Sequence, residues 1–472
     1  MKTGIVAAAF VCCHVAFGYV PQMVDVRVEP TNVVGRIKPL NGVNNAPRGC
    51  VADKGGNFYA FREAGVSYVR CHDAAINWGY GGSHVADVTC VFPDFDADVD
   101  DPASYDFTLT DNYVQSIVNV KAKPLFRLGQ SIEHWPKKYG VRKPRDFAKW
   151  ARICEHIIRH YNEGWADGLR LGIRHWEIWN EADLKWPDCP DCPTWDGTEE
   201  EYHELYRVTA RHLKSRFPDL LIGGPACAGF RRDWIERFVA AMARDRVPMD
   251  FFSWHQYTYK TNLIPELATF VRQTLDANGF TATTSVLDEW GYNRNFGTQQ
   301  YYSGRERMAD DALRAASFMV ATLCDAQNLP IDLMCLYDAR PGTTFNVLWD
   351  MRYGSRPLKG YWALCAWRRM LEFGAQVKVL PISDPEFRAV AALRGDGRRV
   401  AVLVSRYRFN QDEFLMKGAR IDVAGSVVPG ATVRTVDFDY DFQTLSAQHV
   451  KDGKIEVYLE PCSFTLVEMP LK

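Results

Sequence analysis

The sequence lacks the features that mark several classes of protein. With 56 Lys and Arg against 58 Asp and Glu, its formal net charge is −2, and the basic residues are scattered. Because a nucleic-acid-binding surface needs a basic stripe to neutralise phosphates, nucleic acid is not expected as a partner. The length of 472 residues and the hydrophobic content of 47% instead indicate a soluble globular protein with a large core and more than one domain.

Hydrophobic runs long enough to cross a membrane are also missing. The apolar run at residues 4–17 is shorter than the roughly 20 residues that a spanning helix needs. It follows Lys2 and ends in the small-residue site AFG at 16–18, so residues 1–18 are predicted to be a cleaved secretory signal. The mature protein is then expected to be secreted or periplasmic, with no membrane association, and a membrane or lipid anchor is the alternative.

Cysteine does not point to a metal centre. Of 13 cysteines, Cys12 and Cys13 lie in the predicted signal, so an odd number remains and at least one thiol stays free or pairs between chains. Cys189 and Cys192 stand in a Pro-rich loop. Without a second CxxC or a nearby HxxxH, a local disulfide or free thiols are favoured over half of a zinc site.

A Gly-rich turn after the first predicted strand is missing as well, since residues 44–49 read NNAPRG, and this disfavours an open dinucleotide-binding sheet. What is present is an alternation of short apolar runs with stretches of helical period, which is typical of a parallel sheet wrapped by helices. Eight such units predict an α/β fold, the (β/α)8 TIM barrel. The predicted strands are residues 37–44, 66–72, 123–128, 173–180, 220–225, 251–257, 284–288 and 331–337.

After about residue 373 the pattern changes to closely spaced strands, with hairpin signals at Asp396-Gly397 and Asp452-Gly453. This predicts a C-terminal all-β sandwich module. Apolar residues alternate near residues 24–28, so the N-terminal segment is expected to add a strand to the module. The predicted organisation is a signal at 1–18, an N-terminal strand at 19–36, a catalytic barrel at 37–372 and a β-sandwich domain at 373–472.

Polar residues collect where the predicted strands end, which is the end of a (β/α)8 barrel that carries its chemistry. Glu181 and Glu289 each stand where an apolar run stops, and a carboxylate there is costly to desolvate and adds nothing to packing. We therefore expect a carboxylate pair that faces one cleft and performs general acid/base work. Other strand ends carry RCHD at 70–73, HQY at 255–257 and YD at 337–338.

These segments resemble the clan A retaining glycoside hydrolases. WEIWNE at 176–181 looks like the acid/base segment of that clan, and LDEW at 287–290 looks like its nucleophile segment. LNGVNNAP at 40–47, VRCHD at 69–73 and the following β-module are similar to family 39, the β-xylosidase and α-L-iduronidase group. The likeness extends over nearly the whole mature chain.

The resemblance implies a role for each of these residues. Glu181 would protonate the glycosidic oxygen and later activate water, while Glu289 would attack the anomeric carbon. A retaining site places the two carboxyls roughly 5 Å apart, so one must hold a proton while the other stays ionised. The predicted substrate-binding and positioning residues are Arg70 and Tyr257 beside Glu289, Asn180 at the sugar 2-hydroxyl, and His72, His255, Trp290 and Tyr337. For the two histidines, a buried and internally satisfied side chain is an equal alternative.

Some assignments stay open in the sequence. Asp288 rivals Glu289 as nucleophile, and because neighbouring strand side chains point to opposite faces, only one of them should face the pocket. Asp338 and Arg340 are candidates for contact with an acidic or branched sugar. Stacking on a sugar face is plausible for the tryptophans of predicted loops and strand ends, which are Trp135, Trp186, Trp195, Trp290 and Trp349.

The sequence therefore predicts a secreted retaining glycoside hydrolase, β-xylosidase-like, that acts without cofactor or metal on β-linked sugars of an oligosaccharide or polysaccharide. An endo-acting clan A glycanase and a catalytically silent sugar-binding barrel are the alternatives. A metal-dependent barrel hydrolase would need a cluster such as His-x-His in the first strand, where the sequence has none.

Overall fold

The computed structural model describes most of the chain after the predicted signal. The signal at 1–18, the pair Cys189 and Cys192, and Trp135 and Trp186 lie outside the described residues. Within the described part, no helix is long and apolar enough to cross a membrane. The described residues are 21–47, 56–74, 84–133, 137–184, 194–229, 231–294, 312–340, 345–350, 356–409, 415–445 and 449–472.

Eight parallel strands close into a barrel, as predicted. Each strand pairs with the next, and β2 pairs with β9 to close the ring. Most strands lie within two or three residues of their predicted bounds, but the first is much shorter and β8 continues four residues further, so Glu289 lies inside a strand. The strands are β2 (Gly42–Asn44), β3 (Tyr68–Cys71), β4 (Lys123–Leu128), β5 (His175–Ile178), β6 (Leu221–Cys227), β7 (Phe251–Thr258), β8 (Thr284–Tyr292) and β9 (Leu333–Leu336).

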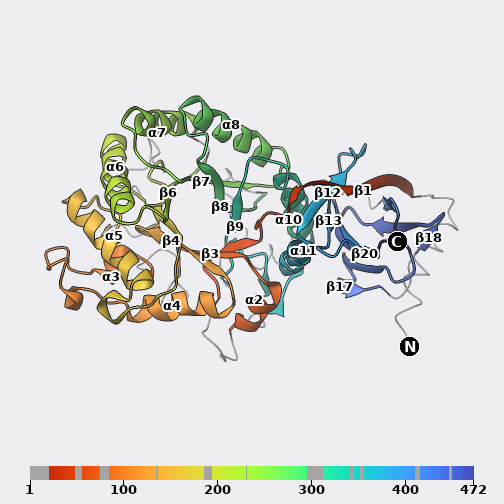
Figure 1. Ribbon diagram of the computed structural model, residues 1–472, viewed down its shortest axis with the longest axis horizontal. Helices are drawn as coiled ribbons and strands as arrows, with labels where there is room; N and C mark the ends of the chain where they lie inside the picture. Colours follow the sequence, from red (N-terminus) through yellow and green to blue (C-terminus); the bar gives the residue numbers. More distant parts are fainter. Residues whose placement is uncertain are drawn as a thin grey trace.

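Helices surround this barrel on its outer side (Figure 1). A capping box is present at the start of α6, where the Thr198 side chain accepts from the Glu201 N–H and the Glu201 carboxylate accepts from the Thr198 N–H. Asp146 caps the start of α5 through two backbone N–H groups. The helices are α2 (Phe58–Ala64), α3 (Val88–Val91), α4 (Thr108–Asn119), α5 (Phe147–Asn162), α6 (Glu199–Arg216), α7 (Arg232–Arg244), α8 (Leu263–Ala277), α10 (Ala312–Ala326) and α11 (Lys359–Phe373), with 3-10 turns at Pro102–Ser104 and Trp165–Asp167.

The C-terminal region forms an all-β module beside the barrel (Figure 1). Its strands make one ten-stranded sheet in the order β17-β16-β20-β14-β13-β12-β1-β15-β19-β18. Apolar side chains from both ends of this order share one buried cluster, so the sheet folds back on itself into two layers. The strands are β1 (Gln22–Arg36), β12 (Ala375–Val379), β13 (Phe387–Leu393), β14 (Arg399–Tyr407), β15 (Lys417–Val423), β16 (Thr432–Val436), β17 (Asp441–Thr444), β18 (His449–Lys451), β19 (Lys454–Leu459) and β20 (Cys462–Pro470), and a separate small ribbon pairs β10 (Trp349–Asp350) with β11 (Arg356–Pro357).

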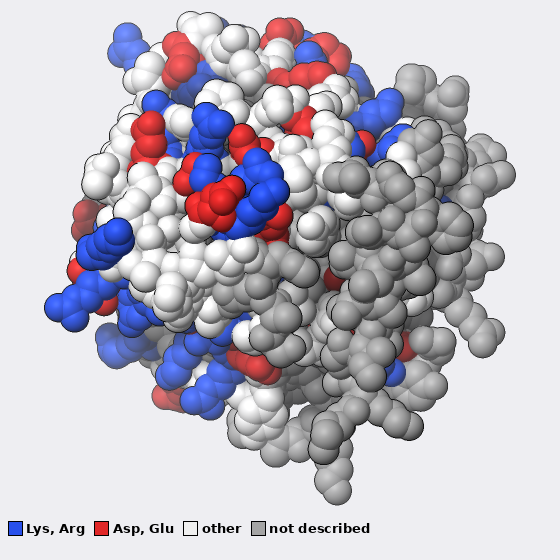
Figure 2. Space-filling view, turned by 90° about the vertical axis from the view of Figure 1, so that its right-hand side faces the viewer, with Lys and Arg blue, Asp and Glu red and all other residues white. Residues whose placement is uncertain are grey.

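The N-terminal strand β1 lies inside the module rather than in the barrel. It pairs antiparallel with β12 and parallel with β15, and its alternating valines are buried in the module core. The predicted hairpin between β18 and β19 is present, with Asp452 and Gly453 both at positive φ, the combination that a tight two-residue turn requires. Figure 2 views the molecule from this end, where acidic and basic side chains are interspersed.

Two long helices, α10 and α11, join the module to the barrel (Figure 1). The Ser405 hydroxyl of β14 donates to the Ser317 carbonyl of α10 at 2.8 Å. Arg369 of α11 donates from Nε and Nη2 to the two carboxylate oxygens of Glu468, at 3.0 and 2.9 Å. A bidentate pair of this kind fixes orientation as well as distance, so the two units are held in a defined arrangement.

Candidate active site

Glu181 lies just beyond the C-terminal end of β5, where the chain turns sharply. Trp179 and Glu181 both have positive φ, which is uncommon for residues with a side chain and is maintained by surrounding contacts. The Glu181 N–H donates to the Ala226 carbonyl at 2.9 Å, and the Thr194 hydroxyl donates to the Glu181 carbonyl at 2.7 Å. These bonds fix the backbone on both sides of the carboxylate, which is 7% exposed.

Glu289 lies on β8 and receives two strong hydrogen bonds. Arg70 Nη1 donates to Oε1 at 2.7 Å, and the Tyr257 hydroxyl donates to Oε2 at 2.6 Å. Burial raises the pKa of Glu289 to about 7, although His255, Arg70 and the Tyr257 hydroxyl all act in the opposite direction. The carboxyl therefore changes its charge near neutral pH, and its two donors hold it in one orientation.

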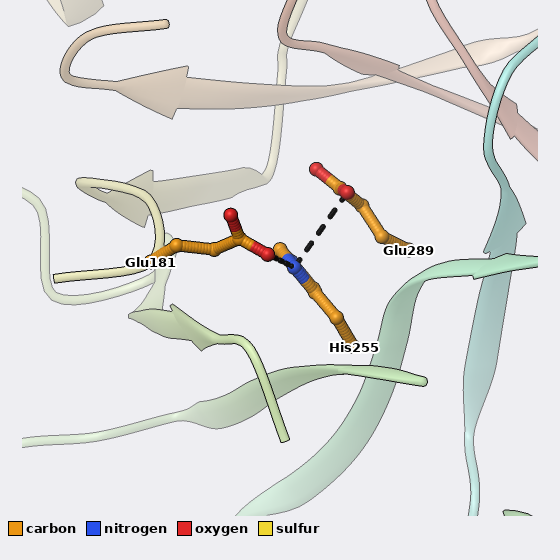
Figure 3. Close-up of side chains that lie close together, drawn as sticks. All are labelled: Glu181, His255 and Glu289. Carbon is orange, nitrogen blue, oxygen red and sulfur yellow. Dashed lines mark hydrogen bonds and ion pairs between the residues drawn. The ribbon is translucent and has the colours of Figure 1, made fainter. Parts of the chain in front are cut away.

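His255 on β7 lies between the two glutamates (Figure 3). Its Nδ1 is 2.7 Å from Glu181 Oε1 and 3.6 Å from Glu289 Oε2. One carboxylate oxygen of each glutamate and one His255 ring nitrogen all lie within 4.8 Å of one another. The two carboxyls are thus much closer than the roughly 6.5–9.5 Å that an inverting mechanism requires to admit a water.

The same three side chains are the one group of potential metal ligands found among the described residues. The 2.7 Å contact between His255 Nδ1 and Glu181 Oε1 is a hydrogen bond, which needs a proton between the two atoms. A metal site would require both atoms to point unshared electron pairs at the ion. We therefore interpret the group as two neighbouring carboxyls with His255 hydrogen-bonded to Glu181, and not as a metal site.

Arg70 of β3 is fully buried beneath this pair and contacts five polar side chains, of which Asn44 on β2 accepts from Nη1 at 3.3 Å. Nε is 2.7 Å from Glu177 Oε2 and 2.9 Å from Asp288 Oδ2, while Nη2 donates to Asn180 Oδ1 at 2.8 Å. The remaining contact is the bond from Nη1 to Glu289. A buried guanidinium with this many acidic neighbours is held rigidly, so it can orient both Asn180 and Glu289.

The bond from Arg70 also decides the orientation of the Asn180 amide. Because Oδ1 accepts from Arg70, the Nδ2 group faces away from it, and Nδ2 has no hydrogen-bond partner among the described residues. A buried amide N–H₂ beside Glu181 is costly unless a ligand completes it. It can donate to a sugar hydroxyl.

Asp288 corrects one expectation. Alternation along a strand predicted that Asp288 or Glu289, but not both, would face the interior, yet both contact Arg70. The reason is a β-bulge: Leu287 pairs with Trp254 and Glu289 with His255, which leaves Asp288 as an extra residue.

His72, just beyond the C-terminal end of β3, is a neutral donor. Arg127 Nε donates to its Nδ1 at 3.1 Å, so the ring proton is on Nε2, which lies 3.2 Å from Asp73 Oδ1 and 3.3 Å from Glu289 Oε1. Burial holds the pKa of His72 well below its usual value. His72 and His255 therefore both lie beside the carboxyls of the site, and both also have hydrogen-bond partners within the protein.

Tyr337 and Trp290 border the same region. The Tyr337 hydroxyl donates to Asp73 Oδ2 at 2.6 Å and its ring packs edge-on against Tyr257. Trp290 is buried, and its indole N–H has no partner among the described residues. Asp338 is fully buried, and its carboxylate accepts three hydrogen bonds from Arg340 and one from Asn45, so both of its oxygens already have partners.

Two tryptophans predicted as sugar platforms are core residues instead. Trp195 and Trp349 are 0% exposed, and their indole N–H groups donate to the carbonyls of Thr198 and Ala339. Trp349 also packs edge-on against Phe61. With every edge and face covered, neither ring presents a surface to a sugar, so this part of the prediction is wrong.

The sequence interpretation missed three buried polar residues of the site, Glu177, Arg127 and His84, and gave no role to Asp73 of the strand-end segment RCHD. Glu177 and Arg127 stand inside predicted apolar strands, and a charged residue in such a run was a signal that could have identified them. Asp73 accepts from Tyr337, and its Oδ1 lies 3.3 Å from Nδ1 of His84, which is also buried. Nothing in the pattern near His84 distinguishes it from a surface loop residue.

Comparison with known proteins agrees with this geometry. The model of the family Glycosyl hydrolases family 39 matches residues 54–337, which is more than half of the chain. A β-xylosidase of Geobacillus stearothermophilus is 32% identical over 213 residues, which cover 42% of this chain and 37% of that protein. The chain thus matches well under half the length of this curated relative.

Solved structures show the same fold. A glucosidase from Croceicoccus marinus has a TM-score of 0.73 at 22% identity, over 95% of this chain and 99% of that one. A monomeric β-xylosidase from Caulobacter crescentus has a TM-score of 0.68 at 15% identity, also over 95% and 99%. The predicted fold, a (β/α)8 barrel with a β-module, and the predicted family are both confirmed. The protein is a member of glycosyl hydrolases family 39.

Proposed function

We propose that this protein is a retaining glycoside hydrolase that cleaves β-linked glycosides, with xylosides as the first substrates to test. The observation that carries the proposal is the pair Glu181 and Glu289, with oxygens within 4.8 Å of each other at the C-terminal end of the barrel. Family membership supports the reaction class, and the β-xylosidase relative supports the choice of sugar.

In the first step Glu289 attacks the anomeric carbon while Glu181 protonates the leaving oxygen, which gives a covalent glycosyl-enzyme. The hydrogen bonds from Arg70 and Tyr257 hold the Glu289 oxygens, and both bonds favour its ionised form. In the second step Glu181 accepts a proton from water, which attacks the glycosyl-enzyme and releases the sugar with retained configuration.

Asn180 is the residue best placed to bind the sugar 2-hydroxyl. Its free Nδ2 lies one residue from Glu181 and is oriented through Arg70. A hydrogen bond to the 2-hydroxyl strengthens as positive charge develops on the sugar ring, so it stabilises the transition state more than the ground state.

The test is turnover of aryl β-glycosides by the wild type and by Glu181→Gln and Glu289→Gln. Each substitution should reduce kcat/KM by several powers of ten, because it removes the general acid or the nucleophile. Glu155→Gln is the matched control, since Glu155 is a buried glutamate on α5 that pairs with His212 and Arg216 outside the barrel mouth.

A panel of aryl xylosides, glucosides, galactosides, arabinosides and uronides identifies the sugar. A 2-fluoro sugar followed by mass spectrometry identifies the labelled carboxylate, which should be Glu289. Undiminished turnover in both glutamine variants, or label on a residue other than Glu289, would overturn the proposal.

A further inference from the structure

Asp288 has contacts that the proposed mechanism does not use. The bulge in β8 turns its side chain to the same interior as Glu289. Its carbonyl is held in place, since Asn44 Nδ2 donates to it at 2.7 Å. The Asn44 side chain of β2 thus supports the bulge. The bulge in turn holds Asp288 as a further carboxylate beneath Glu181 and Glu289.

The environment of Asp288 keeps it ionised. Burial alone would raise its pKa, but Arg70 and His255 outweigh this effect and lower the pKa to about 2. Glu177 is the other carboxylate on Arg70 Nε, and burial raises its pKa well above the usual value. Of the two carboxyls on Arg70 Nε, Asp288 is therefore the one whose ionised form is favoured.

Asp288 lies on the far side of His255 from Glu181. Its Oδ1 is 3.5 Å from His255 Nε2, an ion-pair distance, while Nδ1 on the opposite side of the ring is 2.7 Å from Glu181 Oε1. Nε2 has no closer hydrogen-bond partner among the described residues. The three groups thus form a line from β8 through β7 to the end of β5.

We propose that Asp288 is a positioning residue that fixes the proton on His255 Nε2, so that Nδ1 supplies and takes back the proton used by Glu181. The inference rests on the proposed function. Before the first step the Nδ1–H bond breaks and an O–H bond forms on Glu181, which leaves neutral His255 with its Nε2–H toward Asp288. Glu181 then gives this proton to the leaving oxygen as the glycosidic bond breaks.

The second step restores the starting state. Water gives one proton to the Glu181 carboxylate as its oxygen bonds to the anomeric carbon and the bond to Glu289 breaks. That proton returns from Glu181 to His255 Nδ1. One proton leaves with the alcohol and one arrives from water, so the sequence balances without another reactant. An anionic partner that fixes the histidine tautomer is what such an exchange requires.

Other charged groups face His255 and do not replace Asp288. Asp183, in the loop after β5, accepts the Ala228 N–H with both carboxylate oxygens. Glu289 lies on the Nδ1 side, where Arg70 and Tyr257 occupy its oxygens. His72, just beyond the end of β3, acts electrostatically on His255, but its Nε2 is directed to Asp73 and Glu289.

The experiment compares Asp288→Asn with the matched control Glu177→Gln. Both replace a buried carboxylate on Arg70 Nε with an amide of the same shape, but of the two only Asp288 lies at His255. Substrates are aryl β-xylosides from dinitrophenyl, which leaves without protonation, to phenyl, which needs an acid.

For Asp288→Asn we expect kcat/KM to fall about 100-fold on the phenyl xyloside and less than about threefold on the dinitrophenyl xyloside. For Glu177→Gln the two substrates should lose the same factor. Equal losses of Asp288→Asn on both substrates would mean a merely structural role and would overturn the inference.

A measurement on the wild type does not depend on the folding of a variant. In ¹⁵N-histidine NMR spectra, His255 should carry a proton on Nε2 in every form that is seen, either as imidazolium or as the Nε2–H tautomer. A neutral His255 with its proton on Nδ1 would contradict the role proposed for Asp288. Absence of turnover on every aryl glycoside would instead contradict the proposed function, and the NMR result would still decide the inference.

Discussion

Replacement of Tyr257 by Phe should shift the pH at which Glu289 becomes a nucleophile. The Tyr257 hydroxyl donates to Glu289 Oε2 at 2.6 Å, and both groups are buried. A hydrogen bond to a charged group contributes about 1.5–3 kcal/mol, and one pKa unit corresponds to about 1.4 kcal/mol. The bond stabilises the ionised carboxylate, so its loss raises the pKa of Glu289 from about 7 by about one to two units.

The direction of the effect on rate follows from the charge that Glu289 must carry. Attack requires the ionised form, so activity rises as pH rises through this pKa. At pH 7 about half of the wild-type carboxyl is ionised, and in Tyr257→Phe only about 1–10% is ionised, so the rate there should fall roughly 5- to 50-fold. Above about pH 10, where Glu289 is almost fully ionised in both, the two proteins should converge.

The cleanest assay is inactivation by a dinitrophenyl 2-fluoro-xyloside. Its leaving group needs no acid, so the rate of inactivation follows the charge of Glu289 rather than the proton of Glu181. Tyr337→Phe is the matched control, because Tyr337 packs edge-on against Tyr257 but donates to Asp73. An unchanged midpoint in Tyr257→Phe, or an equal shift in both variants, would refute the reasoning.

The remaining predictions concern stability. Arg70→Met leaves Asp288 and Glu289 without their buried cation, so the free energy of unfolding in urea should fall by about 3–5 kcal/mol at pH 7. The loss should be smaller at lower pH, where the carboxyls of the variant gain protons; an equal loss at every pH would argue against a charge effect. Trp349→Phe should lower the free energy of unfolding by about 1–3 kcal/mol, because the Ala339 carbonyl loses its donor, and should leave KM unchanged. A higher KM with unaltered stability would instead mean that Trp349 binds sugar.

Much of the fold followed from local pattern. The alternation of apolar runs and helical stretches predicted eight strands, and β4 has the predicted bounds. This succeeded because the strands of a closed parallel barrel are buried on both faces, so each reads as a short apolar run. Glu181 and Glu289 were identifiable for the same reason, since a carboxylate at the end of such a run has no role in packing.

The tryptophans show where local pattern failed. Trp195 and Trp349 stand in stretches that resemble loops, yet both are fully buried, Trp195 against Trp179 and Trp349 against Tyr361 and Phe61. Whether a large ring in a loop faces solvent or the core depends on which elements pack over it. Tertiary contacts determine this, so the local sequence around the tryptophan does not predict its burial.

Sequence alone determined the class of fold, the family and the two carboxylates that we propose as catalytic, because periodicity and residue type act over a few neighbours. Only the tertiary structure decided the contacts around these carboxylates. It decided which Glu289 oxygen accepts from Arg70 and which accepts from Tyr257, and it formed the bulge that places Asp288 beside His255 Nε2. A bulge is a mismatch of register between β8 and both of its neighbours, so it exists only once the barrel has closed.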